Sequence, residues 1–178
     1  MSGWRPGDRR PDAASMLRVN QAGEYGATRI YAGQLAVLRA NSPTSKLIAR
    51  MDGQERRHLA RFNALMAERR VRPTVLQPVW NVAGFALGAA TALMSEKAAL
   101  ACTDAVETEI DRHYGAQLEE LGSADPELAA DIAEFRAEEL EHRDSAREAG
   151  AAEAFGYPLL TAAVRGACRL AIGLSKRI

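Results

Sequence analysis

Two short segments of the sequence each place a glutamate three residues before a histidine. Glu55 precedes His58 in the first segment, and Glu139 precedes His142 in the second. The chain has only three histidines, so two of them stand in this arrangement. Residues at positions i and i+3 project from the same side of a helix, so each pair could offer a carboxylate and an imidazole to one metal ion. One such pair alone would be weak evidence, because exposed salt-bridging residues often have this spacing.

A further glutamate precedes each pair at nearly the same distance. Glu24 lies 31 residues before Glu55, and Glu107 lies 32 residues before Glu139. The chain thus repeats one pattern, a lone glutamate and then Glu-x-x-His, in two consecutive halves. This set is typical of di-iron carboxylate proteins with the ferritin-like fold. The repeat predicts a metal site made by Glu24, Glu55, His58, Glu107, Glu139 and His142.

The residue types at these six positions suit two iron ions. Four carboxylates and two neutral imidazoles provide hard oxygen donors with one nitrogen donor for each metal. The four negative charges also offset the four positive charges of two ferrous ions. Structural zinc sites favour cysteine and histidine, so the set argues against such a site. We therefore expect two iron ions in each chain.

Four long segments with helical periodicity carry these residues. The composition is rich in Ala, Leu, Glu and Arg, and no useful alternating strand pattern occurs, which favours an all-α fold. Each apolar face is interrupted by a glutamate, and buried carboxylates are costly unless they are paired or bound to a cation. The interruptions are therefore expected to meet inside a ferritin-like four-helix bundle. Breaks between helices are expected at residues 40–45, 71–79, 122–127 and 156–158.

Several acidic residues compete with the predicted ligands. In the third segment, a heptad repeat selects Glu107 over its neighbour Glu109. Glu138 and Glu141 flank the second Glu-x-x-His pair and are predicted to face solvent. The heptad comprises Leu93, Leu100, Glu107 and Tyr114.

The charges of the chain balance overall but not locally. Lys+Arg and Asp+Glu number 23 each, so no global field indicates a nucleic-acid partner. Residues 46–72 carry eight basic and three acidic residues, whereas residues 127–153 carry nine acids and three arginines. Two helices of opposite charge could lie side by side, or each could face solvent. The second interpretation is the simpler.

The length of 178 residues fits one domain with a short appendage. Residues 1–14 have no apolar stretch typical of a secretory signal and are predicted to be a flexible lead-in to a single domain, residues 15–178. Cys102 and Cys168 make no disulfide framework, which fits buried thiols in a reducing compartment.

Two apolar segments fall outside the ligand pattern. The 23 residues 73–95 are uncharged, and the segment 157–178 is amphipathic with a basic end. The first approaches the length of a membrane span, but prolines and polar residues weaken that interpretation. Its G-x-x-x-G motif, at residues 84–88, indicates close helix packing in lipid. Both segments could cover the core, or they could form membrane-facing helices that lie on a bilayer without crossing it.

Five stretches of sequence resemble the demethoxyubiquinone hydroxylase family, over nearly the whole chain from Leu17 onward. The most specific is LRVNQAGEYGATRIYAGQ, residues 17–34. The resemblance implies a membrane-associated, ferritin-like di-iron monooxygenase that hydroxylates the ring of a demethoxyubiquinol, and its six ligands fall on the six residues above. The other stretches are QERRHLARFN (54–63), ACTDAVETEIDRHY (101–114), FRAEELEHRD (135–144) and GACRLAIGLSKRI (166–178).

The resemblance also implies roles for His113 and Tyr114. The family has a His-Tyr pair at this point that is linked with quinone binding or electron transfer. Periodicity alone does not decide whether His113 lies near the site or on the protein surface. The family usually has Asp-His before AGEYGA, where this chain has Asn20 and Gln21. Neither matches a ligand, so the departure concerns hydrogen bonds near the site.

The resemblance further implies a polyprenyl benzoquinol substrate, O2 and a membrane lipid surface as partners. A homo-oligomer or accessory proteins of ubiquinone biosynthesis are further expectations. Electrons are expected from NADH, without a tightly bound nicotinamide, because no glycine-rich dinucleotide fingerprint occurs. The expected location is the cytoplasmic face of the cell membrane, or the matrix face of the mitochondrial inner membrane in a eukaryote. The alternative is an iron-binding protein of the ferritin or rubrerythrin type, which would need no lipid-seeking surface.

Overall fold

The computed structural model describes residues 12–177, which form six α-helices and one 3₁₀ turn and contain no strand. The all-α prediction is confirmed. Helix α1 begins at Ala13, two residues before the predicted start of the domain. Residues 1–11 of the lead-in predicted for residues 1–14 lie outside the described residues. The elements are α1 (Ala13–Val37), α2 (Pro43–Glu68), α3 (Gln77–Met94), α4 (Glu96–Leu121), α5 (Pro126–Glu148), η1 (Ala151–Glu153) and α6 (Tyr157–Ser175).

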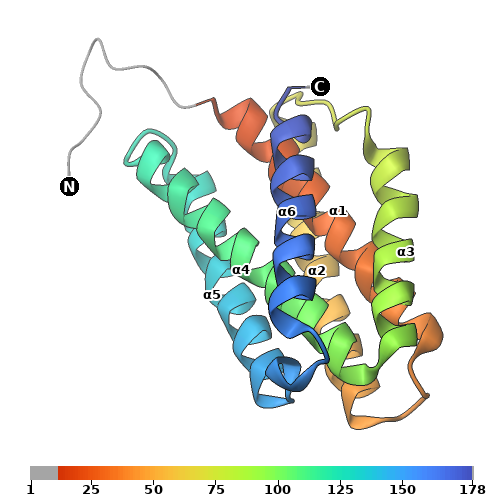
Figure 1. Ribbon diagram of the computed structural model, residues 1–178. Coiled ribbons are helices and arrows are strands. Elements are labelled where there is room, and N and C mark those ends of the chain that lie inside the picture. The colour runs from red at the N-terminus through yellow and green to blue at the C-terminus, as the bar shows by residue number, and fades with distance from the viewer. Residues whose placement is uncertain (1–11, 178) are drawn as a thin grey trace.

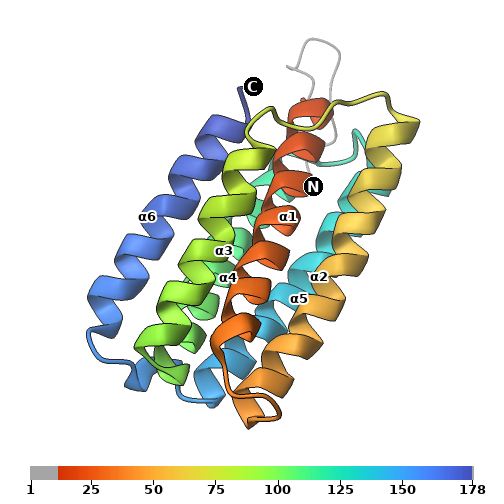
Figure 2. The same cartoon turned by 90° about the vertical axis from the view of Figure 1, so that its right-hand side faces the viewer.

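The six helices form three layers of two antiparallel helices each (Figures 1 and 2). Helices α1 and α4 make the middle layer, with α2 and α5 on one side and α3 and α6 on the other. The two hairpins α1–α2 and α4–α5 carry the predicted ligands and form a four-helix bundle. Helices α3 and α6 cover one face of that bundle.

The predicted ligands lie at mid-length because each helix buries apolar residues on both sides of them. On α1, Glu24 lies between Leu17, which belongs to one apolar cluster, and Tyr31, which belongs to a second. On α2, Met51 and Phe62 flank the Glu-x-x-His pair in the same way. The polar positions are therefore held between two apolar cores, which keep water away from them.

A break at Ser95, which the sequence pattern did not indicate, separates α3 from α4. Ser95 has an extended backbone, and its hydroxyl oxygen accepts a hydrogen bond from Ala98 N at 3.0 Å, so it caps α4. Leu93 consequently belongs to α3, where it is 74% exposed. The prediction that Leu93 begins the buried face of the third ligand helix is wrong. The remaining heptad members Leu100 and Tyr114 are buried as predicted.

The G-x-x-x-G motif brings α3 close to α1 within the protein itself. A Cβ added at Gly88 would lie 1.9 Å from the carbonyl oxygen of Ile30, and one added at Gly33 would lie 2.1 Å from that of Phe85. No side chain larger than hydrogen fits at either position. The motif thus serves packing against α1 within the protein, and not the helix packing in lipid that its pattern predicted.

The two segments of opposite charge lie beside each other as α2 and α5. Arg57 Nη2 lies 2.9 Å from Glu138 Oε2, and Arg61 Nη2 lies 2.8 Å from Asp131 Oδ2. The simpler interpretation, in which each segment faces solvent, is therefore wrong for these residues. Partly exposed pairs of this kind each contribute about 0–1 kcal/mol, so they fix the register of the helices more than they stabilise the fold.

Candidate metal centre

The structure brings the six predicted ligands together in two overlapping groups. Each group offers four ligand atoms that lie within 4.8 Å of one another. Glu55 and Glu139 belong to both groups, so their carboxylates would bridge two ions. All six side chains are buried. The groups are Glu24, Glu55, His58 and Glu139, and Glu55, Glu107, Glu139 and His142.

Both histidines point their Nδ1 atoms into the cluster. His58 Nδ1 lies 3.1 Å from Glu139 Oε1, and His142 Nδ1 lies 3.1 Å from Glu139 Oε2. Their outer Nε2 atoms face acceptors: Glu138 Oε2 at 2.9 Å from His58, and Gln54 Oε1 at 3.1 Å from His142. In the neutral imidazole, Nε2 therefore carries the proton and Nδ1 presents its lone pair to the cluster.

The partners of the outer nitrogens are residues that sequence reasoning misplaced or missed. Glu138 was predicted to face solvent, but its side chain is only 22% exposed and accepts from His58. Gln54 received no role. The signal was present in the sequence, since each partner directly precedes the glutamate of one pair and reaches the histidine of the other. Glu141 is exposed, as predicted.

Two tyrosines cross between the hairpins to hold the lone glutamates. Tyr31 of α1 donates to Glu107 Oε1 at 2.5 Å, and Tyr114 of α4 donates to Glu24 Oε1. Burial raises the pKa of both phenols, and Glu107 raises that of Tyr31 further, so both remain donors. Tyr114 was expected near the site from the family resemblance, whereas no role at the site was predicted for Tyr31. Each follows its helix's own glutamate by seven residues.

The buried charges of the cluster favour binding of cations. Burial raises the pKa of Glu55 and of Glu107, and the Glu139 carboxylate raises both further. Burial lowers the pKa of His58, but its hydrogen bond with Glu139 and the nearby Glu24 carboxylate outweigh this and raise that pKa to about 10. A buried site with more carboxylates than positive charges takes up protons or metal ions.

The chemistry of the residues fits two iron ions. Four buried carboxylate oxygens have no hydrogen-bond partner: Glu24 Oε2, both oxygens of Glu55, and Glu107 Oε2. Unsatisfied buried acceptors are rare, and here they converge with the Nδ1 atoms of two histidines. Each group supplies three carboxylates and one imidazole, which suits a divalent ion of intermediate hardness such as ferrous iron.

Glu109 is fully buried yet lies apart from this cluster. Its carboxylate accepts hydrogen bonds from Arg165 at 2.7 Å and Arg169 at 2.7 Å, both on α6, and from Arg112 at 3.0 Å. The preference for Glu107 over Glu109 as the member of the ligand cluster agrees with this geometry. Glu109 instead fastens α6 to α4.

His113 lies in a hydrogen-bonded network beside the cluster. Its Nε2 lies 3.2 Å from Asn20 Oδ1 and 2.9 Å from Gln117 Nε2, while Asn20 and Gln117 pair through two amide hydrogen bonds. Burial lowers the pKa of His113 to about 4, and the charge of Lys176 lowers it as well. The imidazole is therefore neutral at neutral pH, and Asn20, at the position that departs from the family pattern, is one of its partners.

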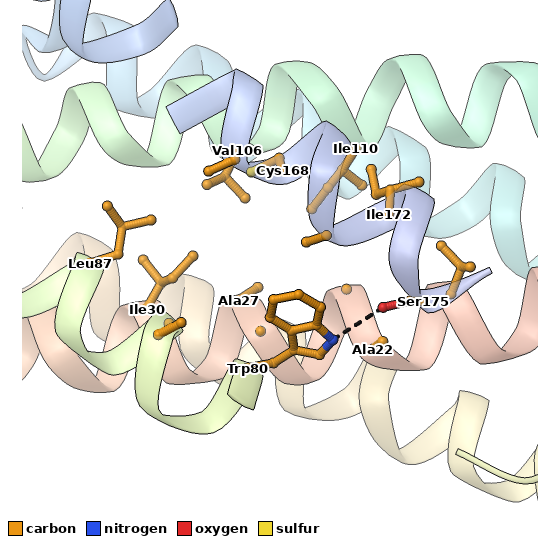
Figure 3. Close-up of a pocket in the computed structure, with 17 residues that line it drawn as sticks. Ala22, Ala27, Ile30, Trp80, Leu87, Val106, Ile110, Cys168, Ile172 and Ser175 are labelled. Carbon is orange, nitrogen blue, oxygen red and sulfur yellow. Dashed lines mark hydrogen bonds between the residues drawn. The ribbon is translucent and has the colours of Figure 1, made fainter. Parts of the chain in front are cut away.

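An apolar cavity of about 160 Å³ lies on the other side of α1 and α4, under α3 and α6 (Figure 3). Ile30, Leu87, Ile110 and Ile172 are among its lining residues, and each comes from a different helix. Trp80 Nε1 donates to Ser175 Oγ at 3.1 Å and so links α3 to α6 beside the cavity.

Only the middle layer of helices separates this cavity from the cluster of predicted ligands. The cavity-lining Gly23 and Val106 directly precede Glu24 and Glu107. Ala22, Gly26 and further small residues line it from α1. A planar apolar ring held in the cavity would therefore lie against the helices that carry two of the predicted ligands.

The fold and the site together define a class of protein: a helical protein in which a four-helix bundle, α1, α2, α4 and α5, encloses a carboxylate–histidine cluster able to hold two cations. The model of the family of the ubiquinone biosynthesis protein COQ7 matches residues 11–175. The chain belongs to this family, which confirms the resemblance seen in the sequence.

Relatives from bacteria and eukaryotes agree with this assignment. The chain is 52% identical over 175 residues to the 3-demethoxyubiquinol 3-hydroxylase of Rhodospirillum rubrum, covering 97% of this chain and 82% of the relative. It is 50% identical over 167 residues to the human NADPH-dependent 3-demethoxyubiquinone 3-hydroxylase, mitochondrial, covering 92% and 76%. The 5-demethoxyubiquinone hydroxylase, mitochondrial, of Saccharomyces cerevisiae is 42% identical over 179 residues, covering 92% and 77%.

Proposed function

We propose that this protein is a 3-demethoxyubiquinol 3-hydroxylase, which adds an oxygen atom from O2 to the quinol ring of a polyprenylated intermediate in ubiquinone biosynthesis. The relatives bear names of this activity, and this chain aligns with most of their length. The observation that carries the proposal is the cluster of six buried ligands separated by one helix layer from an apolar cavity. The hydroxylase names favour this activity over the iron-storage alternative.

The six clustered residues would hold two iron ions. Glu24 and His58 would help to hold one ion and Glu107 and His142 the other, and Glu55 and Glu139, which belong to both groups, would contribute to both positions. Bound iron would supply the activation of O2, which amino-acid side chains do not provide. Tyr31 and Tyr114 would hold the terminal carboxylates in place through their hydroxyl groups.

The cavity would orient the substrate. Its apolar lining suits a quinol ring with its first isoprenoid carbons, and the small residues of α1 leave room for a planar ring. A polyprenyl tail is much larger than about 160 Å³, so it would extend outward between α3 and α6. His113 is neutral at neutral pH and is hydrogen-bonded to Asn20. Since it forms no ion pair with any residue that the structure describes, it would exchange a proton near the quinol ring without breaking one.

The outer layer would meet the membrane. Several apolar side chains of α3 and α6 point into solvent, among them Val82, Leu159 and Leu170. Among residues 12–177, no helix combines the length and apolarity needed to cross a bilayer. We propose a peripheral position on the cytoplasmic face of a cell membrane, or on the matrix face in mitochondria. Electrons would come from a nicotinamide donor. The family resemblance led us to expect NADH, whereas the human relative's name specifies NADPH.

The test is an analysis of lipid quinones from cells that lack this protein. We expect a demethoxy intermediate to accumulate and ubiquinone to be restored by the wild-type chain. Complementation with Glu139→Ala should fail, whereas Glu141→Ala, which changes an exposed residue of the same helix, should restore ubiquinone. Accumulation of an intermediate from another step would contradict the proposed reaction.

A further inference from the structure

The two metal positions differ in what holds the outer nitrogen of their histidine. At the position of His58, the acceptor is the carboxylate of Glu138, at 2.9 Å. At the position of His142, the acceptor is the neutral amide oxygen of Gln54, at 3.1 Å. The rest of the donor set is matched, because each position has one terminal glutamate, one Nδ1 atom and the same two bridging glutamates.

The two acceptors also contact each other, which fixes their orientation. Gln54 Nε2 donates to Glu138 Oε2 at 3.2 Å, so its amide oxygen is turned toward His142. Arg57 Nη2 donates to the same carboxylate at 2.9 Å. The negative charge of this chain of hydrogen bonds therefore lies at Glu138, directly against the imidazole of His58.

This difference changes the donor strength of the two histidines. A hydrogen bond from Nε2–H to a carboxylate is stronger than one to an amide, and it increases electron density at Nδ1. Arg57 offsets part of the charge, but its side chain is 56% exposed, so water screens its effect. In the neutral form that binds metal, the imidazole beside Glu138 is consequently the stronger ligand.

We propose that Glu138 is a positioning residue that makes the two metal positions unequal. The ion held by Glu24 and His58 binds more tightly and enters first, and the ion held by Glu107 and His142 enters second. The inference rests on the proposed two-metal centre and goes beyond it, because it assigns the order of filling and the residues that set it. Replacing a partner at this distance from a metal typically changes affinity by about 10- to 100-fold.

The order can be measured on the full-length chain with zinc(II) as a diamagnetic substitute for ferrous iron. The metal is removed with a chelator, and zinc is added stepwise while the ¹⁵N resonances of the histidine side chains are recorded. Calorimetry gives the two dissociation constants. Circular dichroism before the titration establishes that each variant is folded. Three variants are compared with the wild type: Glu138→Gln, Gln54→Glu and, as a matched exposed control on α5, Glu141→Gln.

We expect the first zinc ion to shift His58 and the second to shift His142. Glu138→Gln should weaken the first step by about 10- to 100-fold and remove the order, because both histidines then face an amide. Gln54→Glu should strengthen binding of the second zinc ion and so bring the two dissociation constants closer together. If Glu138→Gln fails to fold, this variant alone tests the inference. Glu141→Gln should behave as the wild type does.

Two results would overturn the inference in different ways. If two ions bind and both imidazoles shift together in the wild type, or if Glu138→Gln leaves the order and constants unchanged, the assigned inequality is wrong while the two-metal centre stands. If the wild type binds fewer than two ions at the cluster, the proposed metal centre fails, and this inference fails with it.

Discussion

Glu55 and Glu139 are the residues on which both proposed metal positions depend, since each belongs to both groups of ligand atoms. Replacing either with alanine removes one of the two carboxylates that both positions share and leaves the other buried acids uncompensated. We predict about two irons per chain in the wild type and loss of both in Glu139→Ala. Elemental analysis of purified protein measures this, with Glu141→Ala as control. Retention of one iron per chain would show that Glu139 is not shared.

His113 offers a test of a role in catalysis apart from metal binding. It contacts Asn20 and Gln117 and is not a member of either ligand group. We predict that His113→Ala lowers turnover of a short-tailed quinone analogue while the iron content stays at the wild-type value. Activity and iron are measured on the same preparation. Full activity would show that His113 has no role in the reaction. Loss of iron would show that His113 helps to hold the metal ligands in place.

The same histidine should contribute to the pH dependence of the unfolding free energy. Burial holds its folded pKa at about 4, below the value of 6.5 expected in the unfolded chain. The unfolded state therefore binds the proton first, and stability falls as the pH falls from about 6.5 toward about 4. Histidine NMR should show that the His113 imidazole is still neutral at pH 5.5. A His113 resonance that titrates near 6.5 would contradict this environment.

At the scale of elements, the contact between α1 and α3 depends on glycine. Gly88→Ala would place a methyl group 1.9 Å from the carbonyl oxygen of Ile30, so the helices must separate. We predict a loss of roughly 1–3 kcal/mol of unfolding free energy, measured by denaturant titration. Gly53→Ala on α2 is the control, because its Cβ meets no atom within 4 Å and alanine favours helix by up to about 1 kcal/mol. Equal stability of the two variants would show that α3 does not pack this closely.

The attachment of α6 depends on Glu109 in a similar way. Hydrogen bonds from Arg169, Arg165 and Arg112, opposed by burial, lower the pKa of this carboxyl to about 2. Its contribution to stability is therefore present above pH 4.5 and is lost as the pH falls toward 2. We predict that Glu109→Gln costs roughly 1–3 kcal/mol at pH 7 and flattens the acid limb of the stability profile. Glu119→Gln, an exposed change on the same helix, should alter neither.

At the scale of the whole molecule, the three layers expose apolar side chains on the α3 and α6 face. We predict that the protein sediments with phospholipid vesicles, and that the double variant Leu159→Ser/Leu170→Ser binds them markedly less. Both residues are exposed, so the melting temperature should change little. Ala60→Ser/Ala64→Ser, on the opposite layer, is the matched control. Equal binding by both double variants would mean that another face meets the lipid.

The sequence by itself determined the helices and the residues of the cluster. Helical periodicity depends on local geometry, and a buried acid that interrupts an apolar face stands out wherever the helices lie. The interruption at Glu24 and its repetition 83 residues later at Glu107 therefore predicted a shared site before any packing was known. The break at Ser95 was missed because a single capping serine gives a weak local signal.

Only the tertiary structure decided which residues meet across the hairpins. Tyr31 holds Glu107, and Glu138 holds His58, although 76 and 80 residues separate the members of these pairs along the chain. Such contacts depend on the register and layer order of packed helices. These follow from side-chain interlocking and from close approaches such as Gly88 against α1. Periodicity predicts which face of a helix is buried. The hydrogen-bond partner of each buried polar atom is determined only when the helices pack against one another.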